Sequence, residues 1–262
     1  NNKLRIQEFM IRPDGAKNFS EAVRMCFLVI QCLKKIISDR GMSISVGDEG
    51  GFAPMISSNE EALRLIVKSI EKAGFKNGKQ ISICLDVAAN ELYKNKKYSI
   101  HSKKYLNVEQ TINKYIKLIK KFKIKSIEDP FFENDWLAWS RFNKATKKIQ
   151  IVGDDLYVTN LERLKKGFLY ESSNSILIKL NQIGTVSETL DVIRFANNIG
   201  YKTVISHRSG DSEDTFIADL AVGTNSNQIK TGSLSRSERV SKYNQLIRIE
   251  EDLGSNARMN YL

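Results

Sequence analysis

The sequence has few cysteines, no long apolar run and no targeting signal. Its 262 residues include three cysteines, Cys26, Cys32 and Cys84, which form no CxxC pair, so neither a disulfide framework nor a cysteine-based metal site is expected. No apolar run approaches the roughly 18 residues of a membrane span. The first residues, NNKLRIQEF, lack a signal-peptide pattern. The sequence therefore predicts a reduced, cytoplasmic protein.

The composition is that of a folded but basic protein. Hydrophobic residues make up 41% of the chain, which is enough for one large core, and α/β barrels commonly reach this length as a single domain. Much of the net charge of +11 lies between Glu91 and Ser126, where eleven lysines stand with only two acids. Because the aromatic residues of this stretch form no pattern for base stacking and no nucleic-acid motif is present, it indicates a solvated helix face more than a nucleic-acid surface.

Hydrophobic periodicity predicts a regular alternation of strands and helices without a domain break. The expected strands cover residues 4–11, 81–86, 125–129, 149–155, 175–180, 202–207 and 228–230. The expected helices cover residues 19–39, 58–73 and 235–253 and begin near residues 108, 134, 161, 186 and 213. The pattern is one leading strand, two helices and six strand-helix units.

Strands buried on both faces and separated by helices predict a parallel sheet, and six such units favour an α/β fold of the (β/α) barrel type over an open sheet. A closed barrel of this kind has eight strands, and the sequence supplies seven. Residues 91–100 read as a hairpin-like loop decoration with an Asn-Lys-Lys turn. We therefore expect one barrel domain over residues 1–262 that lacks its first strand and is incomplete at the amino terminus.

Three predicted strands end in carboxylates. Asp86, Glu128 and Asp154 close successive strands, and in a (β/α) barrel the catalytic groups lie at the carboxyl ends of the strands. Any one of these acids could be a helix cap or a turn residue. Three in register would repel one another unless a cation lay between them, and oxygen ligands suit a hard ion such as Mg²⁺. The acids that adjoin functional positions, Asp48 and Asp155, are expected to orient backbone.

The later strands end in cationic and polar side chains. Lys179, between two apolar residues of a predicted strand, is expected to point inward, where burial and nearby cations would make it a usable base. His207 and Arg208 close the next strand, Ser209 follows, and Lys230 ends the last one. Arg208 and Ser209 form a polar turn that suits a phosphate or carboxylate.

One glycine-rich loop carries acids. In VGDEGGFAP, residues 46–54, Asp48 and Glu49 stand where a phosphate-binding loop would carry lysine. Since glycine-rich loops bring backbone close to a ligand, we expect an acid to be held against a substrate here. A metal, a base and such an acid suit proton removal next to a carboxylate, followed by loss of a leaving group.

Several segments resemble the signature segments of the enolase family, the glycolytic phosphopyruvate hydratases of bacterial type. They are IQEFM, VGDEGGFAP, SIEDPF, VGDDLYVTN, ILIKLNQIG, ISHRSGDSEDTFIADLAVG and QIKTGSLSRSERVSKYNQLIRIEE, in order from Asn2 to about Leu253. The resemblance implies a barrel of ββαα(βα)6 order behind a small amino-terminal domain. The predicted strands fit that barrel with its first strand missing.

The resemblance also implies an activity and its residues. The family interconverts 2-phosphoglycerate and phosphoenolpyruvate with Mg²⁺, by a general mechanism that is well established for such sites. Lys179 matches its base, Glu49 the acid that protonates the leaving hydroxyl, and Glu8 the companion of that acid. Asp86, Glu128 and Asp154 match the metal ligands. The matched substrate contacts are Glu8, Glu49, His207, Arg208, Ser209 and Lys230, and the family suggests homodimers or octamers.

Two alternatives stay open at this point. One is another enzyme of the enolase superfamily, such as an acid-sugar dehydratase or racemase, which would share the metal and the base but not the phosphate contacts. The other is an inactive fragment that acts as a binding protein. Enolases are reported at cell surfaces, where they bind plasminogen, and as partners of an RNA-degrading endonuclease. The lysines between residues 94 and 125 would then form the contact, and the protein would also occur at the cell surface or be secreted.

Overall fold

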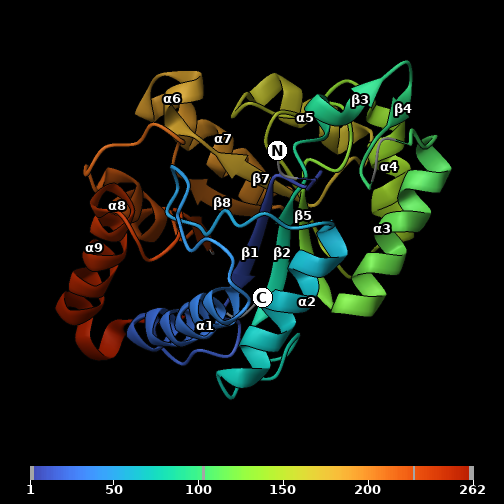
Figure 1. Cartoon of the computed structure of the whole chain (residues 1–262). Coiled ribbons are helices and arrows are strands. Elements are labelled where there is room, and N and C mark those ends of the chain that lie inside the picture. The colour runs from blue at the N-terminus through green and yellow to red at the C-terminus, as the bar shows by residue number, and fades with distance from the viewer. Residues whose placement is uncertain (1–2, 102–103, 227, 260–262) are drawn as a thin grey trace. The chain divides into compact units, whose positions relative to one another are not determined.

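The computed structural model (Figure 1) describes residues 3–101, 104–226 and 228–259. Backbone contacts divide the chain into two compact units, each formed by segments that are distant in sequence. Unit 1 comprises Asn1–Met10, Ile56–Arg64 and Ser82–Thr203, and unit 2 comprises Ile11–Met55, Leu65–Ile81 and Val204–Leu262. Among the described helices, none combines the length and the apolar composition that crossing a membrane requires.

All seven strands predicted from the sequence are present. They are hydrogen-bonded in the order β1-β2-β5-β6-β7-β8-β9. Their bounds are β1 Glu8–Arg12, β2 Ser82–Asp86, β5 Ile124–Glu128, β6 Gln150–Gly153, β7 Ser175–Ile178, β8 Lys202–Ser206 and β9 Gln228–Lys230. The registers of β2 with β5, β5 with β6, β6 with β7 and β8 with β9 are parallel. The predicted alternation of parallel strands and helices is therefore confirmed.

The helices of unit 1 follow its strands along the chain. They are α3 Val108–Phe122, α4 Trp136–Ala145, α5 Leu161–Leu169, α6 Leu180–Ile183 and α7 Val186–Asn198, while α2, Asn59–Lys72, is divided between the units. Side-chain caps fix several helix starts. Asn107 forms a capping box with Gln110 at the start of α3, and Asn160 and Thr185 accept hydrogen bonds from the first turns of α5 and α7.

The core of unit 1 contains a cluster of aromatic rings next to its sheet. Every residue of β2 and β7 is buried, as expected for strands covered on both faces. The ring of Phe131 lies 5.2 Å from that of Tyr98, 5.9 Å from that of Tyr115 and 5.6 Å from that of Phe142. These edge-on contacts between fully buried rings are typical of a well-packed core.

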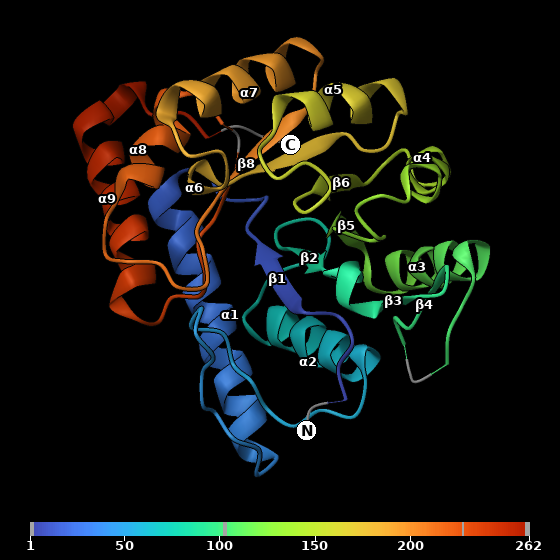
Figure 2. The same ribbon diagram turned by 90° about the horizontal axis from the view of Figure 1, so that it is seen from above.

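The predicted decoration at residues 91–100 is a two-stranded hairpin in unit 1. Its strands are β3, Tyr93–Lys94, and β4, Lys97–Tyr98, and Figure 2 shows them beside α3. Asn95 and Lys96 both have positive φ, 51° and 58°, which is the geometry of a two-residue hairpin turn. A short 3-10 helix, Ala89–Leu92, precedes the hairpin.

Unit 2 packs three helices together. They are α1 Phe19–Asp39, α8 Phe216–Gly223 and α9 Ser237–Leu253, and Figures 1 and 2 both show α9 beside α8 and α1. The Glu250 carboxylate, on α9, accepts hydrogen bonds from the backbone N–H groups of Phe19 and Ser20. A carboxylate at these unpaired N–H groups caps the start of α1 and ties it to α9.

Several predicted boundaries were wrong. The helices predicted from residues 134 and 235 begin at Trp136 and Ser237, and the strand predicted to end at residue 155 ends at Gly153. The strand assigned to residues 175–180 ends at Ile178, and the short helix α6 begins at Leu180, so Lys179 is the residue before a helix and not part of a strand. The helix predicted from residue 213 begins at Phe216, where the Asp214 carboxylate accepts a hydrogen bond from the Phe216 N–H at 2.9 Å. The first strand is shorter than predicted because it begins at Glu8.

Candidate active site

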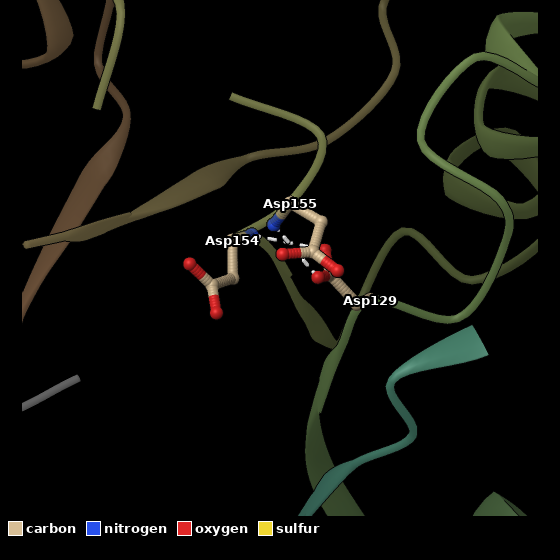
Figure 3. A group of neighbouring side chains, drawn as sticks. All are labelled: Asp129, Asp154 and Asp155. Atoms are coloured by element: carbon tan, nitrogen blue, oxygen red, sulfur yellow. Dashed lines mark hydrogen bonds between the residues drawn. The ribbon is translucent and has the colours of Figure 1, made fainter. Parts of the chain in front are cut away.

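Unit 1 holds three neighbouring carboxylates at the carboxyl ends of β5 and β6, Asp129, Asp154 and Asp155 (Figure 3). One ligand atom of each lies within 4.8 Å of the others. The Asp129 carboxylate accepts hydrogen bonds from the backbone N–H of Asp154 at 2.9 Å and of Asp155 at 2.8 Å. Asp129 thus fixes the turn that carries the other two acids.

Burial raises the free energy of the charged form of these carboxylates. Burial raises the pKa of Asp129 well above its usual range, and the charges of Asp154, Asp155 and Asp86 raise it further. The pKa of Asp155 is also raised, first by burial and then by Asp154, although Lys179 and Asn90 oppose the shift. Because like charges this close repel one another, a cation bound among these carboxylates would stabilise their charged forms.

Lys179 is an ionic partner of this group. Its Nζ lies 2.5 Å from Asp154 Oδ2, and its backbone N–H donates to Thr159 Oγ1 at 2.9 Å. This ion pair places Lys179 beside the carboxylate group, and its role as a base stays a prediction. Its position comes from the turn between β7 and α6.

Asp154 offers an oxygen to a cation. Its Oδ1 is buried, and among the described residues no hydrogen-bond donor reaches it. A buried carboxylate oxygen without a donor is rare because it loses its hydration without compensation. Oxygen donors of this kind fit a hard divalent ion such as Mg²⁺.

The predicted metal ligands are only partly those of the carboxylate group. Asp154 is one of its members, whereas Asp86 and Glu128 end β2 and β5 and face each other as register partners, 6% and 3% exposed. Sequence reasoning missed Asp129 as part of this group and treated Asp155 as an orienting residue. In the structure the orienting carboxylate is that of Asp129.

Unit 2 holds a second group of predicted site residues around His207. The imidazole is 3% exposed, and its Nε2 lies 3.5 Å from Glu49 Oε2. Burial lowers the pKa of His207, the neighbouring Glu49 opposes that shift, and the charges of Arg239 and Lys230 add to it. Burial thus favours the neutral form of His207, which has a carboxylate on one side.

The acidic glycine loop packs on the segment before α9. Gly50 has φ +78°, and a Cβ built there would lie 2.5 Å from the backbone oxygen of Ser235. Gly232 has φ +83°, and its Cβ would lie 2.7 Å from the backbone oxygen of Glu49, which also accepts a hydrogen bond from the Ser233 N–H at 2.9 Å. Glycine is needed at both positions because the two backbones approach so closely. These glycines thereby set where Glu49 stands.

The remaining predicted residues lie at strand ends. Arg208 and Ser209 are exposed just after β8, and Asp211 Oδ2 accepts a hydrogen bond from the Arg208 N–H at 3.1 Å. Lys230 ends β9, and its carbonyl accepts a hydrogen bond from the His207 N–H at 3.0 Å. Glu8 is half-buried at the start of β1 in unit 1. Apart from the loop residue Glu49 and Glu8 at the start of β1, the predicted residues thus lie at or just after the carboxyl ends of strands.

These strands, helices and clustered acids are those of an α/β barrel domain of the enolase type. The family described as the enolase C-terminal TIM barrel domain matches residues 1–261. The chain therefore belongs to the enolase family, which confirms the resemblance and the fold class.

One curated relative is close in sequence. The enolase of Pelagibacter ubique (strain HTCC1062) is 76% identical over 260 residues, which are 99% of this chain and 62% of that protein. The chain thus spans less than two thirds of the length of this relative. The comparison covers all the predicted site residues.

Proposed function

We propose that the chain carries the catalytic residues of an enolase, which interconverts 2-phosphoglycerate and phosphoenolpyruvate. The observation that carries the proposal is the pair of Lys179 Nζ and Asp154 Oδ2, 2.5 Å apart beside the buried carboxylates. An amine and a divalent-cation site together are what removal of a proton next to a carboxylate requires.

Asp154 would hold Mg²⁺ through its unpaired oxygen, and Asp86 and Glu128 are proposed as the further ligands. The observations that support Mg²⁺ are the buried Oδ1 of Asp154 and the mutual repulsion of the neighbouring carboxylates. When bound, the ion supplies positive charge for the substrate carboxylate as the proton leaves.

In the proposed reaction Lys179 Nζ takes the proton from carbon 2 of 2-phosphoglycerate. Glu49 donates a proton to the hydroxyl on carbon 3, the carbon–oxygen bond breaks, and water leaves as the double bond forms. Atoms and charge balance when Lys179 enters the step as a neutral amine, released from its ion pair with Asp154, and Glu49 enters as the protonated acid, because Lys179 then gains one proton and Glu49 loses one. Glu8 is proposed as the companion carboxylate of Glu49.

Substrate binding is proposed for the cationic and polar residues of unit 2. Arg208 and Ser209 are exposed and suit a phosphate group, since guanidinium and hydroxyl groups donate to its oxygens. His207 and Lys230 are proposed as further substrate contacts. A hydroxy acid without phosphate would leave Arg208 and Ser209 without an anion, which disfavours the acid-sugar alternative.

The test is Mg²⁺-dependent formation of phosphoenolpyruvate from 2-phosphoglycerate, followed by its ultraviolet absorbance. We expect activity that EDTA removes and Mg²⁺ restores, and that Lys179→Ala lacks. Lys165→Ala is the matched control because Lys165 is 44% exposed and pairs with Glu162 instead. Turnover of unphosphorylated acids at a comparable rate, or activity indifferent to EDTA, would contradict the proposal.

A further inference from the structure

Helix α9 buries two cationic side chains that sequence reasoning assigned no role. Arg239 is 1% exposed and Lys242 is fully buried, and as residues i and i+3 they lie on one face of the helix. Burying such groups is costly unless their N–H donors find acceptors, and of the Arg239 donors only the buried Nε lacks a hydrogen-bond partner among the described residues. The acceptors of these two side chains therefore identify the segments that are held against this face of α9.

Arg239 donates to the segment after β8 and to the glycine loop. Its Nη1 lies 2.6 Å from His207 Nδ1 and 2.7 Å from the Arg208 carbonyl oxygen. Its Nη2 lies 2.5 Å from the Ser209 carbonyl oxygen and 3.2 Å from that of Asp48. One rigid guanidinium thus joins the backbone of two loops that carry predicted site residues.

Lys242 holds the same segment further along. Its Nζ lies 3.4 Å from Asp211 Oδ1 and 2.6 Å from the Glu238 carbonyl oxygen, and it also donates to the Ser212 carbonyl oxygen. Residues 207–212 are therefore attached to α9 at both ends.

The contact with Arg239 fixes the tautomer of His207. A guanidinium has five N–H donors and no acceptor, so Nδ1 must accept and cannot carry a proton. A neutral imidazole then carries its proton on Nε2. That N–H lies on the side of Glu49, whose Oε2 is 3.5 Å away.

We propose that Arg239 is a positioning residue that holds His207 as the Nε2–H tautomer, with its donor directed at Glu49. The part of the proposal that concerns turnover rests on the proposed function. When Glu49 has given up its proton, the Nε2–H of His207 donates to the carboxylate that remains. A His207 with its proton on Nδ1 would present a lone pair to that carboxylate and repel it.

The first experiment reads the tautomer directly. The chain has two histidines, His101 and His207, so ¹⁵N imidazole spectra are simple, and His207→Gln assigns the signals. We expect His207 to carry its proton on Nε2 alone at neutral pH. A proton on Nδ1, or a mixture of tautomers in the unmodified chain, overturns the proposal without any variant.

Two variants then test the cause. Arg239→Met removes all donors, and we expect the single tautomer to become a mixture. Arg236→Gln is the matched control, because Arg236 donates to the Gly47 carbonyl oxygen of the same loop and not to His207. If Arg239→Met does not fold, Arg239→Lys is used instead. It replaces the guanidinium by a single ammonium group, which cannot donate to His207 and to both loops at once. If a folded Arg239→Met keeps the single tautomer of His207, Arg239 does not fix that tautomer. The same conclusion follows if Arg236→Gln also gives a mixture of tautomers.

Turnover supplies a separate result. In the Mg²⁺-dependent assay we expect Arg239→Lys to lower kcat about tenfold or more, with little change in KM, because the acid and not substrate binding is affected. The tautomer spectra need no activity. An inactive chain with the expected tautomers would therefore contradict the proposed function and leave the positioning role of Arg239 supported.

Discussion

The Nζ of Lys179 lies 2.5 Å from Oδ2 of Asp154, while the other oxygen of that carboxylate is buried without a donor among the described residues. One carboxylate therefore faces both the proposed base and the proposed ion. The two proposed functions can be separated by mutation, because a substitution of Lys179 removes the base and a substitution of Asp154 removes a metal ligand.

Lys179→Ala is expected to abolish exchange of the carbon 2 proton of 2-phosphoglycerate with solvent deuterium, because no other proposed residue takes that proton. Mg²⁺ binding, measured by calorimetry on the same sample, is expected to stay near normal. NMR of the substrate in D₂O provides the exchange rate. Retained exchange in Lys179→Ala would remove Lys179 from the role of base.

Mg²⁺ is expected to stabilise the chain against heat. At a concentration 100 times its Kd, a ligand of the folded state adds about 2.7 kcal/mol, or roughly 5–11 °C in Tm for a chain of this size. Asp154→Asn is expected to remove this increment. Asp191→Asn is the control, since Asp191 is an exposed acid that pairs with Arg194. Equal Mg²⁺-induced shifts in the two variants would contradict the assignment of Asp154.

Gly50→Ala is expected to destabilise unit 2 by roughly 2–5 kcal/mol, from a positive φ and a clash with the Ser235 backbone. Gly41→Ala separates the two causes. Gly41 has φ +68° but nothing within 4 Å of the added Cβ, so we expect only about 1–2 kcal/mol. Urea unfolding of both variants measures the difference. Equal losses would mean that the close approach of the two backbones is not rigid.

Stability is expected to fall in acid partly because of His207. Its pKa is lowered in the folded chain, chiefly by burial, so the unfolded chain takes up a proton first as pH falls below about 6.5. The contribution of His207 is thus complete above that pH and is lost below it. The other charged groups facing the imidazole are Glu49, Arg239 and Lys230.

Unfolding free energies between pH 5 and pH 8 measure this effect. His207→Gln is expected to flatten the profile below about pH 6.5, whereas His101→Gln, at an exposed position, is expected to leave it unchanged. A profile that is equally steep in both variants would assign the acid sensitivity to carboxylates.

The strands were predictable because each is a short apolar run between polar helices. Lys179 was placed in such a run, but the backbone turns there, where Thr159 Oγ1 accepts from its N–H and α6 begins. That hydrogen bond joins residues 20 positions apart, so no local pattern could show it. The helix predicted from residue 213 starts late for a local reason, the cap at Asp214.

Sequence reasoning could place acids at or just after the ends of apolar strands, as at Asp86, Glu128 and Asp154, while their role as metal ligands stays a prediction. Asp129 was overlooked because its carboxylate serves backbone N–H groups that only folding brings near. Arg239 lies in the polar run SRSER, which is typical of an exposed helix start. Its burial depends on tertiary packing against loops from elsewhere in unit 2.

The parallel registers of unit 1 also govern how its acids come together during folding. Asp86 pairs with Glu128, 42 positions later, Glu128 with Val152 after 24, and Val152 with Ser175 after 23. Each pairing encloses at least one helix, so none can form as a local hairpin, and the entropy of closing such loops slows folding. The carboxylates can therefore meet only when segments of at least 23 positions have been closed into loops, so the acidic group is assembled by long-range pairing and not by local structure.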